Sequence, residues 1–210
     1  AEVDDALAES GTAGPTTVAL QAGVGSFAAA GLRHYRSHAD GLPVRTAIVE
    51  PRTANCLFRS AEAGRSTEAP PPHPSTMAGL NCGLPSPLTW PDIHHAADVF
   101  IGIDDEATYE AMRELASAGI VAGESGAAAL GGLLAVARGG SASQRSAAGL
   151  SGDAIVLIVN TEGATDPVNY RSVVGADPEQ IRAEAERRRS ASAVVEHVIT
   201  HHPERSHTHG

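Results

Sequence analysis

The feature that most constrains this chain is a repeated succession of a short buried run, a glycine or proline turn and a helical segment. Thr16–Leu20 and Arg45–Val49 are β-branched and apolar, and each is followed by a turn and a segment of helical length. Val99–Ile103 and Ala154–Val159 extend the series. Strands that alternate with helices indicate parallel βαβ units. The sequence therefore predicts an α/β fold of three αβα layers around a mainly parallel sheet.

The segments between these runs differ in character. The stretch 64–89 is rich in proline and is expected to be an irregular loop within the domain. Asp104 is expected to cap the helix that follows the third strand. We expect helices at Glu2–Glu9, Ser26–Ser37, Thr53–Ala63, from Asp104 to about Ala118, at Gly123–Arg138, and from Pro178 to about His201.

Composition narrows the choice of partners. The chain has 210 residues, of which 42% are hydrophobic but only 3% aromatic, so small aliphatic side chains must build the core. Its formal net charge of −10 argues against nucleic acid or an anionic membrane surface as a partner. No apolar run reaches membrane-spanning length, and we expect a cytoplasmic protein. All 15 basic residues are arginines, so no lysine is present to form a Schiff base.

Cysteine and histidine residues suggest no metal site. Cys56 and Cys82 fit no zinc motif, and they are either two free thiols or one bridge. His94 and His95 are expected on the surface of a short helix. The arginines 187–189 are expected to form a solvated helix face. The tail histidines, at positions 197, 201, 202, 207 and 209, have a spacing that chelates metals, but they lie in a polar terminal segment.

A glycine turn between the first strand and its helix is the first candidate ligand site. Gln21-Ala22-Gly23-Val24-Gly25-Ser26 lets the backbone approach a ligand closely, and the helix that follows offers free N–H groups to a phosphate. Ser26 adds a hydroxyl group. The turn lacks the third glycine of the dinucleotide fingerprint and the lysine of a Walker loop. By itself it is either an anion site or a simple tight turn.

Two further motifs stand at the ends of secondary-structure elements. Ala122–Ala128 opens a helix, where Glu124 either caps the N-terminus or faces a ligand. Asn160–Pro167 follows the fourth strand, where ligands of open α/β sheets gather. Thr161 in this stretch offers a neutral hydroxyl to a ring nitrogen.

Together these motifs resemble the fold-type II pyridoxal-phosphate (PLP) enzymes, whose fold is that of the tryptophan synthase β subunit, and most closely the diaminopropionate ammonia-lyases. The resemblance runs from about residue 1 to about residue 174 and covers roughly the C-terminal half of such an enzyme. The matching stretches are Gln21–Gly25, Ile48–Pro51 with Ala54 and Cys56-Leu57, Thr76–Leu80 with Cys82-Gly83 and Pro85, Gly123–Ala127, and Thr161–Gly163 with Thr165–Pro167 and Tyr170-Arg171.

The resemblance implies roles for these residues. Gly23, Val24, Gly25 and Ser26 would bind the phosphate of PLP. Thr161 would face the pyridine nitrogen, and Glu124 would lie near the ring. Such an enzyme converts 2,3-diaminopropionate to pyruvate and ammonia by β-elimination, and it works as a homodimer. Glu50 would support the fold near the site, and the proximity of the two cysteines would be a family feature.

Two departures accompany the resemblance. The family's Schiff-base lysine and its loop for the substrate carboxylate belong to the N-terminal half, and neither motif is found here, so no catalytic residue is assigned. The segment 175–210 extends beyond the family pattern as an extra helical, histidine-rich tail. We therefore expect residues 1–174 to be the C-terminal part of a PLP-binding large domain, completed by a complementary half. The alternatives are an inactive fragment or half of a serine or threonine dehydratase.

Overall fold

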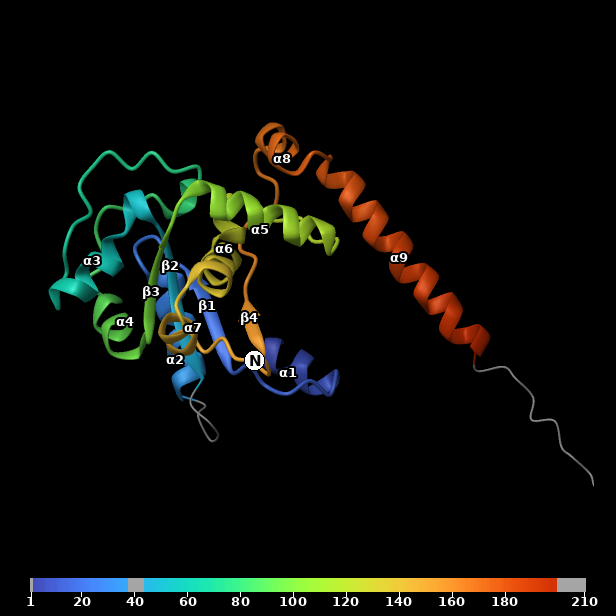
Figure 1. Cartoon of the computed structure of the whole chain (residues 1–210), viewed down its shortest axis with the longest axis horizontal. Coiled ribbons are helices and arrows are strands. Elements are labelled where there is room, and N and C mark those ends of the chain that lie inside the picture. The colour runs from blue at the N-terminus through green and yellow to red at the C-terminus, as the bar shows by residue number, and fades with distance from the viewer. Residues whose placement is uncertain (1, 38–43, 200–210) are drawn as a thin grey trace, which may run out of the picture.

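A computed structural model describes residues 2–37 and 44–199 of the chain. Its centre is a sheet of four parallel strands in the order β3-β2-β1-β4 (Figure 1). The strands are β1 (Thr17–Gln21), β2 (Arg45–Pro51), β3 (Val99–Ile103) and β4 (Val156–Ile158). All four strands lie at positions where the apolar runs predicted them, and the parallel sheet is confirmed.

Alternate residues of the central strands point to opposite faces, and helices cover both. Val18, Leu20 and Ile48 pack on one side in a cluster with residues of α2 (Ser26–Ser37), α3 (Cys56–Ala63) and α4 (Trp90–Ala96). Ala19 and Ala47 pack on the other side against α6 (Glu124–Gly139). The predicted three-layer αβα architecture is therefore confirmed.

Small residues let these layers approach closely, as the shortage of aromatic residues predicted. A Cβ atom added at Gly132 of α6 would lie 2.7 Å from a methyl group of Val49 in β2. The helix α5 (Asp105–Ser117) packs on the outside of α6 and extends this layer.

The predicted helix Thr53–Ala63 is wrong in one respect, because it is divided. A short 3-10 turn, η1 (Arg52–Ala54), precedes α3, which begins at Cys56. The carboxylate of Glu50 accepts the backbone N–H groups of Leu57 and Phe58 at 2.9 and 2.8 Å, which fixes the start of α3. Asp104 occupies the N-cap position of α5, but its side chain makes no capping hydrogen bond and instead pairs with Arg52 at 3.3 Å.

The remaining short elements precede, connect or follow the strands. The helix α1 (Glu2–Glu9) precedes β1, and the 3-10 turn η2 (Ala78–Leu80) interrupts the otherwise irregular segment 64–89. Two short helices were not predicted, α7 (Ala142–Ala147) and α8 (Pro167–Val174). Each has a local start signal: a capping box of Ser141 and Gln144 for α7, and the side chain of Asp166 for α8.

The final helix α9 (Pro178–Ile199) projects away from the body of the molecule (Figure 1). Its arginines 187–189 are exposed, as are His94 and His95 on α4, as expected. The histidines at 201, 202, 207 and 209 lie outside the described residues, as does the side chain of His197. Within the described ranges, no helix combines the length and the apolar character needed to cross a bilayer.

Candidate cofactor site

The glycine turn lies at the carboxyl edge of the sheet, directly after β1. Gly25 has a φ of +99°, a backbone conformation that residues with a Cβ rarely adopt. A Cβ atom at Gly23 would lie 2.8 Å from Cys82 Sγ, and the N–H of Ser86 donates to the carbonyl of Val24 at 2.9 Å. The proline-rich segment therefore forms the wall behind the turn.

The turn leads directly into the N-terminus of α2. No acidic side chain lies in the first turn of this helix, and Ser26, with its hydroxyl, is its first residue. The first N–H groups of an α-helix have no partner within the helix, and the helix dipole makes this end positive. The beginning of α2 is therefore suited to an anion.

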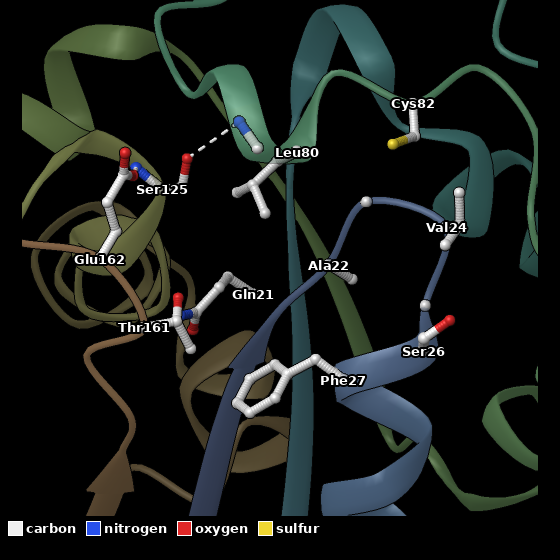
Figure 2. A pocket seen from close by; sticks show the side chains of 13 residues that line it. Gln21, Ala22, Val24, Ser26, Phe27, Leu80, Cys82, Ser125, Thr161 and Glu162 are labelled. Atoms are coloured by element: carbon white, nitrogen blue, oxygen red, sulfur yellow. Dashed lines mark hydrogen bonds between the residues drawn. The ribbon is translucent and has the colours of Figure 1, made fainter. Parts of the chain in front are cut away.

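The turn forms one side of a pocket of about 460 Å³, drawn in Figure 2. The strand β1, the turn and the start of α2 contribute one wall, η2 and its neighbour Cys82 a second, and the start of α6 with the segment after β4 a third. The lining residues are Gln21, Ala22, Gly23, Val24, Gly25, Ser26, Phe27, Gly79, Leu80, Cys82, Ser125, Thr161 and Glu162.

Thr161 stands across the pocket from the glycine turn (Figure 2). Its hydroxyl oxygen accepts a hydrogen bond of 2.7 Å from the side-chain amide of Gln21, the last residue of β1. The pairing of β1 with β4 brings these two residues together, although they are 140 positions apart. The pocket thus combines a helix start suited to an anion with a neutral hydroxyl group.

The third wall is held together by Glu162. Its carboxylate accepts the backbone N–H of Ser125 at 2.9 Å and the hydroxyl of Thr165 at 2.7 Å. The hydroxyl of Ser125 in turn accepts the N–H of Gly79 at 3.1 Å. The N-terminus of α6 is therefore already occupied by a carboxylate of this chain.

Glu124 does not lie where the sequence suggested. Its side chain is buried, 6% exposed, accepts a hydrogen bond from the amide of Asn169 in α8, and is not among the residues lining the pocket. Neighbouring residues of a helix point about 100° apart, so Ser125 reaches the pocket wall where Glu124 faces α8.

Comparison with known proteins agrees with this geometry. A family model described as pyridoxal-phosphate dependent enzyme matches residues 2–161. The chain belongs to this family. It is 38% identical over 168 residues to the diaminopropionate ammonia-lyase of Escherichia coli strain K12, an alignment that spans 76% of this chain and 42% of the relative.

Two solved structures place the fold within the same PLP-dependent family. The E. coli diaminopropionate ammonia-lyase in complex with an aminoacrylate-PLP azomethine intermediate superposes with a TM-score of 0.72 and 37% identity, covering 82% of this chain and 45% of that one. The threonine deaminase of T.th. gives a TM-score of 0.59 at 25% identity, over 66% of this chain and 48% of that one. The chain thus spans less than half the length of the relatives it matches.

The pocket fits PLP on three observations. A turn that excludes Cβ atoms and an acid-free helix start suit the phosphate group. Ala22 and Leu80, which lie between the two ends in Figure 2, are apolar and suit the faces of a flat ring. The hydroxyl of Thr161 suits a ring nitrogen without placing a charge beside it.

Glu50 lies outside this pocket and serves the fold. Its side chain is fully buried, and burial raises its pKa to about 7 although two backbone N–H groups and the thiol of Cys56 favour the charged form. Burial, together with the negative charge of Glu50, raises the pKa of Cys56 to about 12. Both Cys56 and Cys82 are free thiols, so no bridge joins them.

The glycine turn and Thr161, which the sequence singled out, line one pocket, but the sequence missed other lining residues. Ser125 and Glu162 are neighbours of residues that it did single out, at the same helix start and strand end. Leu80 and Cys82 come from the proline-rich segment, and only the resemblance, through Thr76–Leu80 and Cys82-Gly83, pointed to them. Gln21 was quoted as part of the turn without a role of its own.

Proposed function

We propose that this chain forms the phosphate- and pyridine-binding side of a PLP-dependent ammonia-lyase that converts 2,3-diaminopropionate to pyruvate and ammonia. The observation that carries the proposal is the single pocket bounded by the free N-terminus of α2 and by Thr161. Support comes from the 38% identity to a diaminopropionate ammonia-lyase over 76% of this chain.

In this proposal Gly23, Val24, Gly25 and Ser26 hold the phosphate, and Thr161 faces the ring nitrogen. When bound, PLP withdraws electrons from the α-carbon of an amino acid, which allows the α-proton and then the β-amino group to leave. A hydroxyl beside the ring nitrogen leaves that nitrogen largely uncharged, which suits elimination. Glu124 supports the pocket wall indirectly, because its hydrogen bond from Asn169 ties the start of α6 to α8.

The covalent attachment of PLP requires a lysine, and this chain has none. Since the relatives are more than twice as long as the matched region, we propose that residues 1–174 are one part of a large domain whose lysine lies in a complementary part. The segment 64–89 is a structural loop of that domain, and 175–210 is an additional tail. The assembled enzyme would be a cytoplasmic homodimer.

Addition of PLP to the full chain tests the proposal. We expect the phosphorus-31 signal of PLP to shift on binding, without a side-chain adduct that borohydride reduces. The N-terminal amine of Ala1 is the one primary amine of the chain, and acetylating it provides the control. An unshifted phosphorus signal at high protein concentration would refute the site. A stable, reducible adduct on a side chain would contradict the assignment of the lysine to another part.

The similarity to a threonine deaminase favours one second candidate, a serine or threonine dehydratase. Ammonia release from diaminopropionate, serine and threonine, measured in parallel on the lysine-bearing assembly, separates the two. Faster release from diaminopropionate supports the ammonia-lyase, and faster release from serine or threonine replaces it with the dehydratase. Full occupancy by PLP with no release from any of the three would make the chain an inactive binding fragment.

A further inference from the structure

Gln21 makes contacts that its place next to the glycine turn does not explain. It is the last residue of β1, it lines the pocket, and only 2% of its surface is exposed. Its side-chain amide donates to the carbonyl of Val159 at 2.9 Å and to the hydroxyl oxygen of Thr161 at 2.7 Å. A buried amide with two bonds to the segment after β4 is a connection between the two sides of the pocket.

The orientation of this amide follows from the chemistry of its partners. A backbone carbonyl only accepts hydrogen bonds, so the atom that faces Val159 must be the NH₂ group. One of its hydrogens goes to Val159 and the other to Thr161, and an amide nitrogen accepts no hydrogen bond. The hydroxyl of Thr161 therefore cannot donate to Gln21.

Within the part of the chain that the structure describes, two hydrogen-bonding groups of Gln21 and Thr161 remain without a partner. Across residues 2–37 and 44–199, the hydroxyl of Thr161 donates to no other group, and Gln21 Oε1 is buried without a partner. A hydroxyl that accepts a strong hydrogen bond becomes a better donor and a poorer acceptor. The hydrogen of Thr161 is thus available to a ligand in the pocket.

We infer that Gln21 is a positioning residue that makes the Thr161 hydroxyl a hydrogen-bond donor and so selects the uncharged form of an aromatic ring nitrogen. This inference rests on the proposed binding of PLP. An uncharged ring nitrogen accepts the bond that Thr161 offers, whereas a protonated one is itself a donor and competes poorly for the same oxygen. Gln21 would act only through Thr161, without touching the ligand.

The test uses the full 210-residue chain and PLP labelled with nitrogen-15 in the ring. Phosphorus-31 spectra report whether PLP is bound, and nitrogen-15 spectra recorded over a range of pH report protonation of the bound ring. We expect Gln21→Met, which keeps the length of the side chain but removes both bonds, to increase the protonation constant of the ring nitrogen about tenfold. The phosphorus shift should remain, because the glycine turn is unchanged.

Thr161→Val supplies the matched background, because it removes the hydroxyl through which Gln21 acts. In that background Gln21→Met should leave the protonation constant unchanged, as a double-mutant cycle requires. If Gln21→Met does not fold, Gln21→Leu serves instead: like methionine it is apolar, so it removes both bonds without adding a charge, and it should increase the constant by a similar factor.

The outcomes are distinct. Equal protonation constants for the wild type and the Gln21 variant, both with PLP bound, overturn the role of Gln21 but leave the site intact. An equal increase with and without the Thr161 hydroxyl also overturns it, because the effect would then not pass through Thr161. A wild-type chain that leaves the phosphorus signal unshifted removes the proposed function, and the inference with it.

Discussion

The helices α2 and α6 both begin at the same pocket, but the N-terminus of α6 is bonded to a carboxylate of the chain and, among the residues that the structure describes, that of α2 is not. The start of α6 has Glu124 in its first turn and holds the carboxylate of Glu162 on the N–H of Ser125. The start of α2 has no acidic residue in its first turn. Within the described ranges, no side-chain carboxylate is bonded to its first N–H groups. The pocket therefore has one helix start suited to an anion and one that already holds a carboxylate. In the proposed function this difference would give the phosphorylated cofactor a single orientation.

Two other helices at this edge of the sheet follow the pattern of α6. The start of α3 holds the carboxylate of Glu50, and Asp105 in the first turn of α5 accepts the hydroxyl of Ser75 at 2.6 Å. The carboxylate of Glu50 thus binds the first N–H groups of α3, and α5 has acidic residues in its first turn, whereas α2 has neither feature in the described part of the chain.

The largest effect is expected from closing the turn in front of α2. Gly25→Ala forces a Cβ into a backbone with φ +99°, where it would clash with Cδ1 of the buried Ile93. We expect a loss of about 2 to 4 kcal/mol in the free energy of unfolding, together with loss of PLP binding. Chemical denaturation and PLP titration measure the two. Gly163→Ala is the control, because a Cβ there meets no atom within 4 Å; equal effects of the two changes would contradict the account of the turn.

The carboxylate at α3 predicts a pH dependence of stability. Burial raises the pKa of Glu50 from 4.5 to about 7 in the folded state, so the folded chain binds a proton more tightly than the unfolded one. The stabilisation by the protonated form is complete below about pH 4.5 and is lost as the pH rises through about 7, a change on the order of 3 kcal/mol. Glu50→Gln should flatten the stability profile between these pH values. An unchanged slope in that variant would show that another group titrates.

Ser26→Asp makes the start of α2 resemble the start of α6. The new carboxylate would repel the phosphate and occupy the free N–H groups, which should weaken PLP binding about 30-fold, or on the order of 2 kcal/mol. Ser26→Asn is the matched control, since asparagine caps helices equally well without a charge. If the two variants bind PLP equally, the anion does not sit at this helix.

The smallest effect on PLP binding is expected from removing the carboxylate at the start of α6. Glu162→Gln removes the charge that holds the N–H of Ser125, and we expect the free energy of unfolding to fall by about 1 to 2 kcal/mol. The affinity for PLP should change little, because the start of α2, which we propose as the phosphate site, is unchanged. Thermal unfolding and PLP titration measure both quantities, with Thr165→Ala as a control that removes only the second bond of Glu162. A large loss of PLP affinity would mean that Glu162 takes part in binding the ligand.

The sequence predicted those elements well whose formation depends on residues within the element and at its ends. The strands β1 to β3 and the helices α2 and α6 are long, regular and bounded by turn residues, so their positions were correct. The division of 53–63 was missed because it depends on Glu50, whose carboxylate reaches forward to α3.

The site was predicted only in part, for a similar reason. The glycine turn and the hydroxyl of Thr161 have local signatures. Which face of α6 meets the pocket depends on how that helix packs, so Glu124 was expected where Ser125 lies. The bond from Gln21 to Thr161 joins positions 140 apart, and no local pattern contains it.

That separation also sets an order of events during folding. The glycine turn needs β1, α2, β2 and the segment 64–89, whose Ser86 donates to the carbonyl of Val24, and all of these lie in the first half of the chain. Thr161 arrives only when β4 pairs with β1 and closes a loop of more than a hundred residues. Contacts between distant residues form more slowly than local ones, because a long loop costs more entropy to close. During folding, we expect the proposed phosphate-binding turn to form first. The hydroxyl of Thr161, proposed to face the pyridine ring, would reach the pocket only after β4 has paired with β1.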